Sequence, residues 1–228
     1  MKARTHLAVI ICDMWADEPR CVSARARADD IARRMNPVVS RLRARGALII
    51  HAPAGCLDFY RDASARRNAI DAPHHHAPVP FDWNDWNGDR ESELPPALTE
   101  SGLCSCDTVA PCRPADEVPR PGTRQTPLVE IHDHDALTDD GQEVYNLLEE
   151  RGIDDVIVMG VHTNRCILGR PYGIRQLVYL GKRPVLCRDL TDSFHRDPRG
   201  HAWGDEYMAV HIARHWCPVT TSADLLGD

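Results

Sequence analysis

The chain of 228 residues has no long apolar run and no excess of positive charge, and each absence excludes a class of partner. A membrane-spanning helix needs about 20 consecutive apolar residues, and no stretch of this sequence approaches that length. The formal net charge is -7, whereas nucleic acids and anionic membranes are bound by basic surfaces. We therefore expect no nucleic acid and no membrane among the main partners.

The first residues also lack the features of a secretion signal. In MKARTHLAVIICDMW the apolar run is short and ends at Asp13, and no small-residue cleavage site follows. The nine cysteines are odd in number and irregular in spacing, so they predict no regular disulfide framework. We expect a cytoplasmic protein whose thiols are mostly free in a reducing compartment.

The tightest cysteine cluster is Cys104, Cys106 and Cys112, in CSCDTVAPC. Three thiols could contribute to a metal site, but no fourth ligand follows at the spacing of a zinc finger. We favour a loop with incidental thiols, or a loop disulfide, over a metal site here.

Short apolar segments alternate with segments of helical periodicity in two parts of the chain. Strands are predicted at 7–12, 47–51, 127–131, 154–160, 182–189 and, as a last short strand, 218–222. Helical segments separate most of them, and this order is typical of a parallel sheet with helices on both faces. We predict a single α/β domain over residues 1–228, in three α/β/α layers with a mostly parallel sheet of about six strands.

Residues 52–126 interrupt the alternation as an irregular insert. The insert holds most of the prolines, the histidine run at 74–76 and several aromatic residues, with little periodicity. Long irregular segments in compact domains are usually functional or covering loops. We expect short helices and an excursion that walls a pocket or meets a partner subunit.

Ligands of such sheets bind at the carboxyl ends of the strands, where two residues have suitable chemistry. Asp13 ends the first strand, and partial desolvation would raise its pKa and let it act as a base; the alternative is a loop carboxylate. Cys166 opens a predicted helix, whose N-terminus favours a thiolate and whose free amides could bind an oxyanion. The alternative for Cys166 is a buried, inert cysteine.

Together these features resemble a known family. Asp13 after the first strand, the G-x-x-T-x-x-C pattern in GVHTNRC and the segment RDLTDS after the fifth strand resemble the isochorismatase-like cysteine hydrolases, which include nicotinamidases and N-carbamoyl amidohydrolases. The resemblance covers about residues 6–51 and 127–222. It implies an Asp–Lys–Cys triad in which the aspartate takes the thiol proton and the cysteine attacks a carboxamide carbonyl. Ammonia then leaves and water hydrolyses the thioester.

The resemblance also implies how the rest of the site is built. Asp13 and Cys166 match the family's aspartate and cysteine. Backbone N–H groups, here assigned to His162 and Cys166, would form the oxyanion hole, and a cis peptide is expected at Val161–His162. Substrate contacts are predicted for Trp15, Asn164 and Arg165.

The family's lysine has no counterpart in this sequence. Lys2 and Lys182 are the only lysines, and LVEIHDHDALTDDG, the matching segment, contains none. His132 stands at the matching position, and we predict it as the third catalytic residue, paired with the thiolate or sharing a proton with Asp13. Arg124 is the alternative source of positive charge.

A catalytic metal is a further alternative, although we expect no cofactor. Nicotinamidases carry an Asp/His cluster after the second strand, whereas this chain has His51 and Asp58 there without the D-x-H pattern. His74, His75 and His76 could contribute, but a histidine run in a proline-rich loop is more often solvated.

The predicted function is hydrolysis of a C–N bond, in a carboxamide or ureido group of a small molecule, through a cysteine thioester. The resemblance further implies a homodimer or homotetramer. One alternative is acid-catalysed hydrolysis by Asp13 without a nucleophile, as in isochorismatases. Another is a non-catalytic binding protein on the same scaffold.

Overall fold

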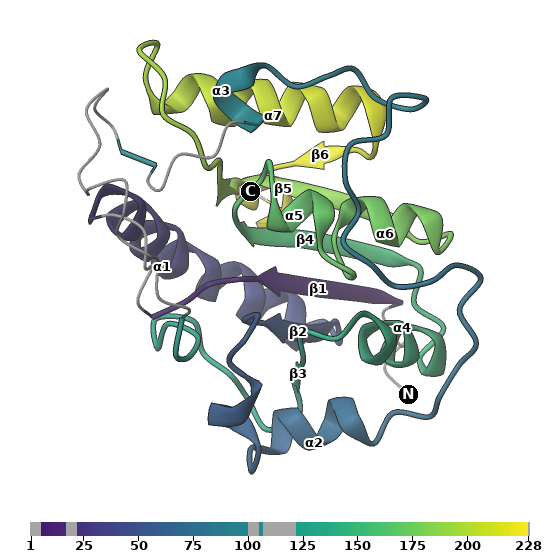
Figure 1. Cartoon of the computed structure of the whole chain (residues 1–228). Coiled ribbons are helices and arrows are strands. Elements are labelled where there is room, and N and C mark those ends of the chain that lie inside the picture. The colour runs from purple at the N-terminus through teal and green to yellow at the C-terminus, as the bar shows by residue number, and fades with distance from the viewer. Residues whose placement is uncertain (1–5, 17–21, 100–104, 107–121, 228) are drawn as a thin grey trace.

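The computed structural model describes residues 6–16, 22–99, 105–106 and 122–227. At its centre is a six-stranded sheet in the order β3-β2-β1-β4-β5-β6, with every neighbouring pair parallel. Helices cover both faces of this sheet (Figure 1), which confirms the predicted three-layer α/β/α fold. The strands are β1 (Leu7–Cys12), β2 (Leu48–Ala52), β3 (Ala136–Leu137), β4 (Asp155–Val161), β5 (Arg183–Asp192) and β6 (Val219–Thr220).

Two apolar cores form because successive strand residues point to opposite faces. Val9 and Ile11 of β1 face the core beneath α1 (Val22–Ala44) and α8 (Ser222–Leu226). Ala8 and Ile10 face the opposite core. The helices of that second face are α4 (Gly141–Glu150), α5 (Cys166–Gly169), α6 (Ile174–Tyr179) and α7 (His201–His215).

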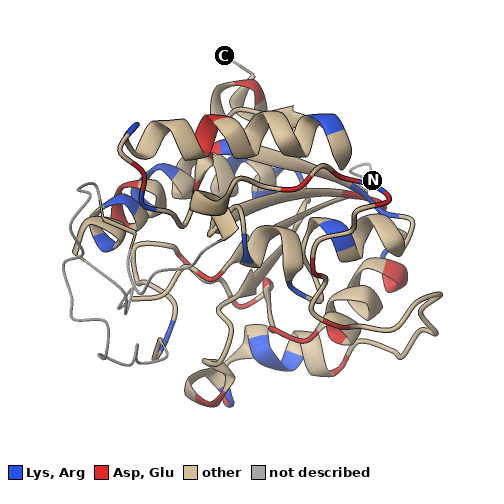
Figure 2. Ribbon diagram, turned by 45° about the horizontal axis from the view of Figure 1, so that its top comes forward, with Lys and Arg blue, Asp and Glu red and all other residues tan. Residues whose placement is uncertain are grey.

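Acidic and basic residues are interspersed along the ribbon (Figure 2). Among the described residues, no helix is long and apolar enough to cross a membrane.

Between β2 and β3 the described residues form only short helices, as expected: η1 (Leu57–Tyr60), α2 (Ser64–Ile70) and α3 (Pro96–Thr99). Part of this segment lies over α5 and α6. The backbone N–H of Asn84 donates to the carbonyl of Gly169 at 2.7 Å, and Arg175 donates to the carbonyl of Asn84 at 2.8 Å. The insert therefore holds the short helix that begins at Cys166.

The strand predicted at 127–131 is wrong, because the structure has turns there and β3 lies at Ala136–Leu137. The side chain of Asn36 takes up the backbone of this segment. It donates to the carbonyl of Leu128 at 2.6 Å and accepts from the N–H of Glu130 at 3.0 Å. These groups are consequently not available to a strand ladder, and His132 precedes β3 instead of following it.

The single helix predicted after Cys166 is two helices, α5 and α6. Pro171 disfavours helical backbone at the residue before it, and Arg170 accordingly has φ -60° and ψ 155°. The helix is therefore broken before Pro171, and Arg170 leaves it at this point.

Candidate active site

Asp13 follows β1 at the carboxyl edge of the sheet. Its φ of 50° lies in the left-handed region, which is uncommon for a residue other than glycine and recurs at functional sites. The carboxylate is completely buried. Its Oδ1 accepts the N–H of Ala54 at 2.8 Å, and its Oδ2 accepts from Nε and Nη2 of Arg170 at 3.1 and 3.0 Å. These hydrogen bonds thus fix the orientation of the carboxylate, and the positive charge of Arg170 balances its negative charge.

Trp15 supports this arrangement from the same loop. Its indole N–H donates to the carbonyl of Ala54 at 3.0 Å, so it helps to fix the residue whose N–H binds Asp13. The ring also packs so closely on Gly122 that a Cβ there would lie 2.2 Å from the indole. Trp15 was predicted to contact substrate, and in this structure it packs against the protein.

Cys166 begins α5, and its buried thiol lies beside the carboxylate of Asp13, with which it interacts electrostatically. Burial, and next the negative charge of Asp13, raise the pKa of Cys166 to about 12. The prediction that a helix N-terminus would lower this pKa is wrong, because α5 has only four residues and burial outweighs its small dipole. The resting thiol is therefore protonated.

Arg170 is the positive charge of this group, and the sequence did not identify it as such. Although burial opposes the shift, the charges of Asp13 and then Cys166 raise the pKa of Arg170. Burial raises the pKa of Asp13, and Arg170 partly offsets that rise. A guanidinium stays charged under all ordinary conditions, so Arg170 keeps Asp13 compensated in place.

The insert covers Arg170 from outside. The ring of Trp83 lies 5.5 Å from Cζ of Arg170, within the range of a cation–π contact. Gly169 permits this approach, since a Cβ there would lie 2.8 Å from the Trp83 ring. The side chain of Arg170 is 26 % exposed while that of Asp13 is 0 % exposed. Solvent therefore reaches Arg170 but not the carboxylate of Asp13.

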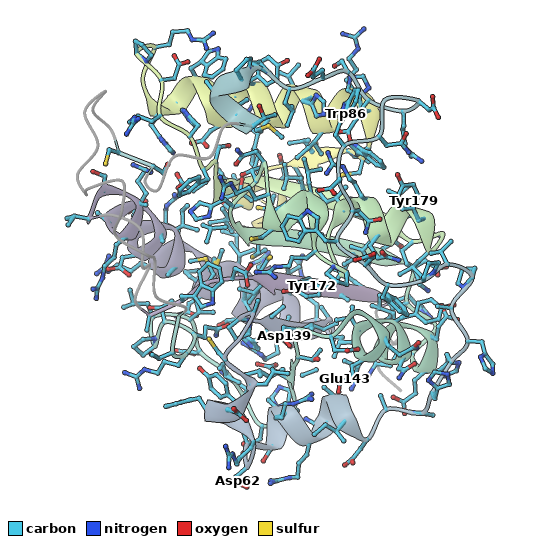
Figure 3. All side chains as sticks on the ribbon, in the orientation of Figure 1. Asp62, Trp86, Asp139, Glu143, Tyr172 and Tyr179 are labelled. Carbon is cyan, nitrogen blue, oxygen red and sulfur yellow. The ribbon has the colours of Figure 1, made fainter. Side chains whose placement is uncertain are left out.

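Two more buried groups complete this cluster, Cys12 and Tyr172. Burial and then Asp13 raise the pKa of both. The hydroxyl of Tyr172, labelled in Figure 3, lies 3.5 Å from the carbonyl of Ala52. Both side chains are therefore uncharged, and they lie beside the carboxylate of Asp13.

The peptide bond between Val161 and His162 is cis, which confirms the expectation from the resemblance. The backbone N–H of His162 donates to the sulfur of Cys166. The carbonyl of His162 accepts from Arg165 at 3.1 Å and from Ile167 at 3.2 Å. The backbone of His162 thus lies beside the thiol, and the oxyanion hole stays a prediction.

Asn164 and Arg165 were predicted to bind substrate. The Asn164 amide donates to the carbonyls of Leu98 and Phe194, both at 2.8 Å, and accepts from the N–H of Phe194 at 2.7 Å. Its hydrogen-bonding groups are thus used within the protein. The guanidinium of Arg165 lies 4.2 Å from the centre of the Phe194 ring. Both residues anchor the Cys166 loop to neighbouring segments.

His132 is not brought to Asp13 and Cys166. Its imidazole lies 3.5 Å from Glu130 and its side chain is 41 % exposed. The segment that contains His132 is fixed by an ion pair between Asp135 and Arg43 at 2.8 Å. Arg43 lies near the end of α1, just before β2 begins. His132 is consequently on the amino side of β3, and Arg170 is the basic residue that contacts Asp13. The alternative, Arg124, lies against the Phe59 ring at 5.6 Å.

The histidines considered for a metal have other contacts. His51 uses both ring nitrogens, on Gln125 at 3.2 Å and on Asp135 at 3.1 Å. Asp58 is exposed and pairs with Arg61. Cys106 is buried, whereas Cys104 and Cys112 lie outside the described residues. Among the described residues, one other group has metal-ligand geometry: Asp192, His201 and Asp205.

Comparisons with known proteins agree with this fold. The model of the isochorismatase domain matches residues 7–224. A cysteine hydrolase from Pseudomonas syringae is similar, with a TM-score of 0.58 and 17 % identity over 97 % of this chain and 91 % of that one. An isochorismatase from Pseudomonas putida has a TM-score of 0.57 and 14 % identity, covering 96 % and 89 %.

An isochorismatase family protein from Burkholderia thailandensis has a TM-score of 0.55 and 15 % identity, covering 98 % of this chain and 96 % of that one. These identities show a shared fold. No curated protein matched the chain.

Proposed function

Since the chain belongs to the isochorismatase family, a family of hydrolases, we propose that it cleaves a C–N bond of a small carboxamide or ureido compound through a thioester on Cys166. The observation that carries the proposal is the position of the buried Cys166 thiol beside the buried, arginine-paired carboxylate of Asp13, with which it interacts electrostatically. A nucleophile in contact with a base that a third group orients is the arrangement required for covalent catalysis.

The reaction begins when Asp13 accepts the thiol proton and the sulfur attacks the carbonyl carbon of the substrate. The N–H groups of His162 and Cys166 stabilise the oxyanion of the tetrahedral intermediate. The C–N bond breaks as Asp13 returns the proton to the leaving nitrogen. Water then loses a proton to Asp13 and attacks the thioester, and the acid and the free thiol are released.

Arg170 takes the place of the family's lysine in this scheme. When the proton moves from Cys166 to Asp13, the buried negative charge moves from carboxylate to sulfur. Arg170 interacts electrostatically with both residues, so the cluster keeps one cation and one anion throughout. An unpaired charge in a buried site would be costly, and Arg170 prevents it at both stages.

The test is to measure ammonia release from a set of small carboxamides and ureido compounds, and to trap the acylated enzyme by rapid quench and mass spectrometry. We expect turnover and an adduct on Cys166, with both lost in Cys166→Ala. Cys217→Ala is the matched control, because Cys217 is also a buried free thiol whose pKa burial raises to about 12. It should keep activity.

Full turnover in Cys166→Ala would overturn the thioester mechanism. Acid-catalysed hydrolysis by Asp13 would then require that Asp13→Asn abolish that turnover. Cys166 alkylation no faster than that of Cys217, together with no turnover, would favour a binding protein. The homodimer or homotetramer, also proposed from the resemblance, is checked by light scattering.

A further inference from the structure

A second polar cluster lies across β4 from Asp13, between the end of β5 and the first turn of α7. Asp192 ends β5, His201 begins α7 and Asp205 follows one turn later. One ligand atom from each lies within 4.8 Å of the other two. The His201 Nε2 is 2.6 Å from Oδ1 of Asp192 and 3.8 Å from Oδ2 of Asp205. An imidazole with two carboxylates is a ligand set that divalent transition metals accept.

Asp192 carries an oxygen whose hydrogen-bonding capacity is unused. The residue is 1 % exposed, and its Oδ1 accepts from Arg27 at 2.9 Å and contacts His201. Its Oδ2 is buried and has no hydrogen-bond partner among the described residues. A buried polar atom without a partner costs about 1–3 kcal/mol, and more when charged. A cation at Oδ2 would remove that cost.

Asp205 also offers a carboxylate oxygen to the cluster. Asp205 uses Oδ1 to accept the N–H of Ser193 at 2.7 Å, which leaves Oδ2 directed to His201. Arg27 is held on the Oδ1 side of Asp192, because its Nη2 also donates to the carbonyl and hydroxyl of Ser105 at 2.7 and 3.1 Å. The guanidinium therefore leaves Oδ2 of Asp192 without a hydrogen bond.

A cavity gives solvent access to this cluster. It has a volume of about 610 Å³ and is lined by residues of α1, β5 and α7, including Asp192 and Asp205. A metal site needs such an entry path in addition to its ligands. The remaining carboxylate of the first turns of α7, Glu206, lines the same cavity and pairs with Arg188 at 3.2 Å.

We propose that Asp192, His201 and Asp205 bind a divalent transition-metal cation such as Mn²⁺ through two carboxylate oxygens and one imidazole nitrogen. Water completes the coordination from the cavity. Because Asp192 belongs to β5 and the other two ligands to α7, the cation cross-links the strand to the helix across the intervening loop. Its main effect is therefore on stability.

The test is a titration of the chelator-treated full-length protein with Mn²⁺, followed by the loss of the free-ion EPR signal. Mn²⁺ is chosen because it prefers oxygen and nitrogen to thiolate. We expect one tightly bound equivalent and a higher melting temperature. Asp205→Asn and His201→Gln should each weaken binding at least tenfold, while Glu206→Gln, with the same charge change in the same cavity, should not.

Absence of Mn²⁺ binding by the wild type would overturn the site. Equal weakening by Glu206→Gln and Asp205→Asn would show a diffuse acidic field, and unchanged binding in all variants would place the ion elsewhere; either result also refutes the proposal. Asp205 is partly exposed, so Asp205→Asn gives a folded test protein, checked by circular dichroism, even if His201→Gln does not. The readout does not depend on hydrolase activity.

Discussion

Replacing Arg170 by methionine tests the arrangement on which the proposed chemistry depends. The substitution keeps a long side chain against Trp83 but removes the guanidinium that donates twice to Oδ2 of Asp13. Breaking a buried ion pair by removing one partner costs about 3–5 kcal/mol if the other stays charged. Asp13 can avoid this cost by binding a proton, because burial already raises its pKa.

The expected result is loss of the base at neutral pH. Activity requires ionised Asp13, so a further rise of its pKa moves the acid limb of the kcat/KM profile to higher pH. Loss of general-base catalysis lowers the rate by about a hundredfold to ten-thousandfold. Arg170→Lys should recover part of the activity, since it restores the charge without the two-point geometry.

The assay is the pH dependence of kcat/KM on the substrate with the highest turnover, together with the melting temperature of each variant. Arg175→Met is the matched control, because Arg175 forms a buried ion pair with Glu91 at 2.6 Å outside the Asp13 cluster. It should lower stability and leave the pH profile unchanged. If Arg170→Met keeps wild-type kcat/KM and the same acid limb, Arg170 does not compensate Asp13 and the reasoning fails.

Three further predictions concern His132, Glu91 and Gly160. His132→Ala should change neither turnover nor the alkylation rate of Cys166, because the imidazole contacts Glu130; a tenfold loss of either would restore it to the site. Despite the opposing effect of burial, buried donors lower the pKa of Glu91 from 4.5 to about 2, so its stabilisation is present above pH 4.5 and is lost as the pH falls through about 2. Glu91→Gln should therefore lower the free energy of unfolding by about 3–5 kcal/mol near pH 7 and by less below pH 4.5. Urea titrations that show the same loss at neutral and at acid pH would contradict this. Gly160→Ala should disrupt the pairing of β1 and β4, since φ is +117° and a Cβ would lie 2.0 Å from the carbonyl of Cys12; a melting temperature within about 2 °C of wild type, where 1 kcal/mol shifts such a domain by about 2–4 °C, would refute it.

The central strands could be predicted from sequence because their apolar runs are buried on both faces. The same runs place Asp13 at a strand end and Cys166 at the start of a helix, and the structure brings the two together. These predictions need only the local pattern of apolar residues and the parallel topology that alternating strands and helices indicate. Both can be inferred from the sequence.

The third residue could not be predicted in the same way. His132 was assigned from a strand that does not form, because Asn36 binds that backbone from α1, a contact between segments far apart in the chain. Arg170 reaches Asp13 because the helix ends just before Pro171. The signal for it is an arginine before a proline, four residues after the cysteine, and its meaning depends on a tertiary contact.

Arg170 and Cys166 lie about one helical turn apart, so a single segment supplies both the positive charge and the thiol, and the β3 edge of the sheet need supply neither. The reacting cluster draws on the ends of β1 and β4, which pair directly with Cys12 opposite Gly160. The third strand of the chain, β3, is only two residues long and contributes none of the residues that contact Asp13. Changes of sequence or length in β3 should therefore leave the reaction centre intact, because its parts come from the ends of β1, β2 and β4 and from the turn that carries Cys166.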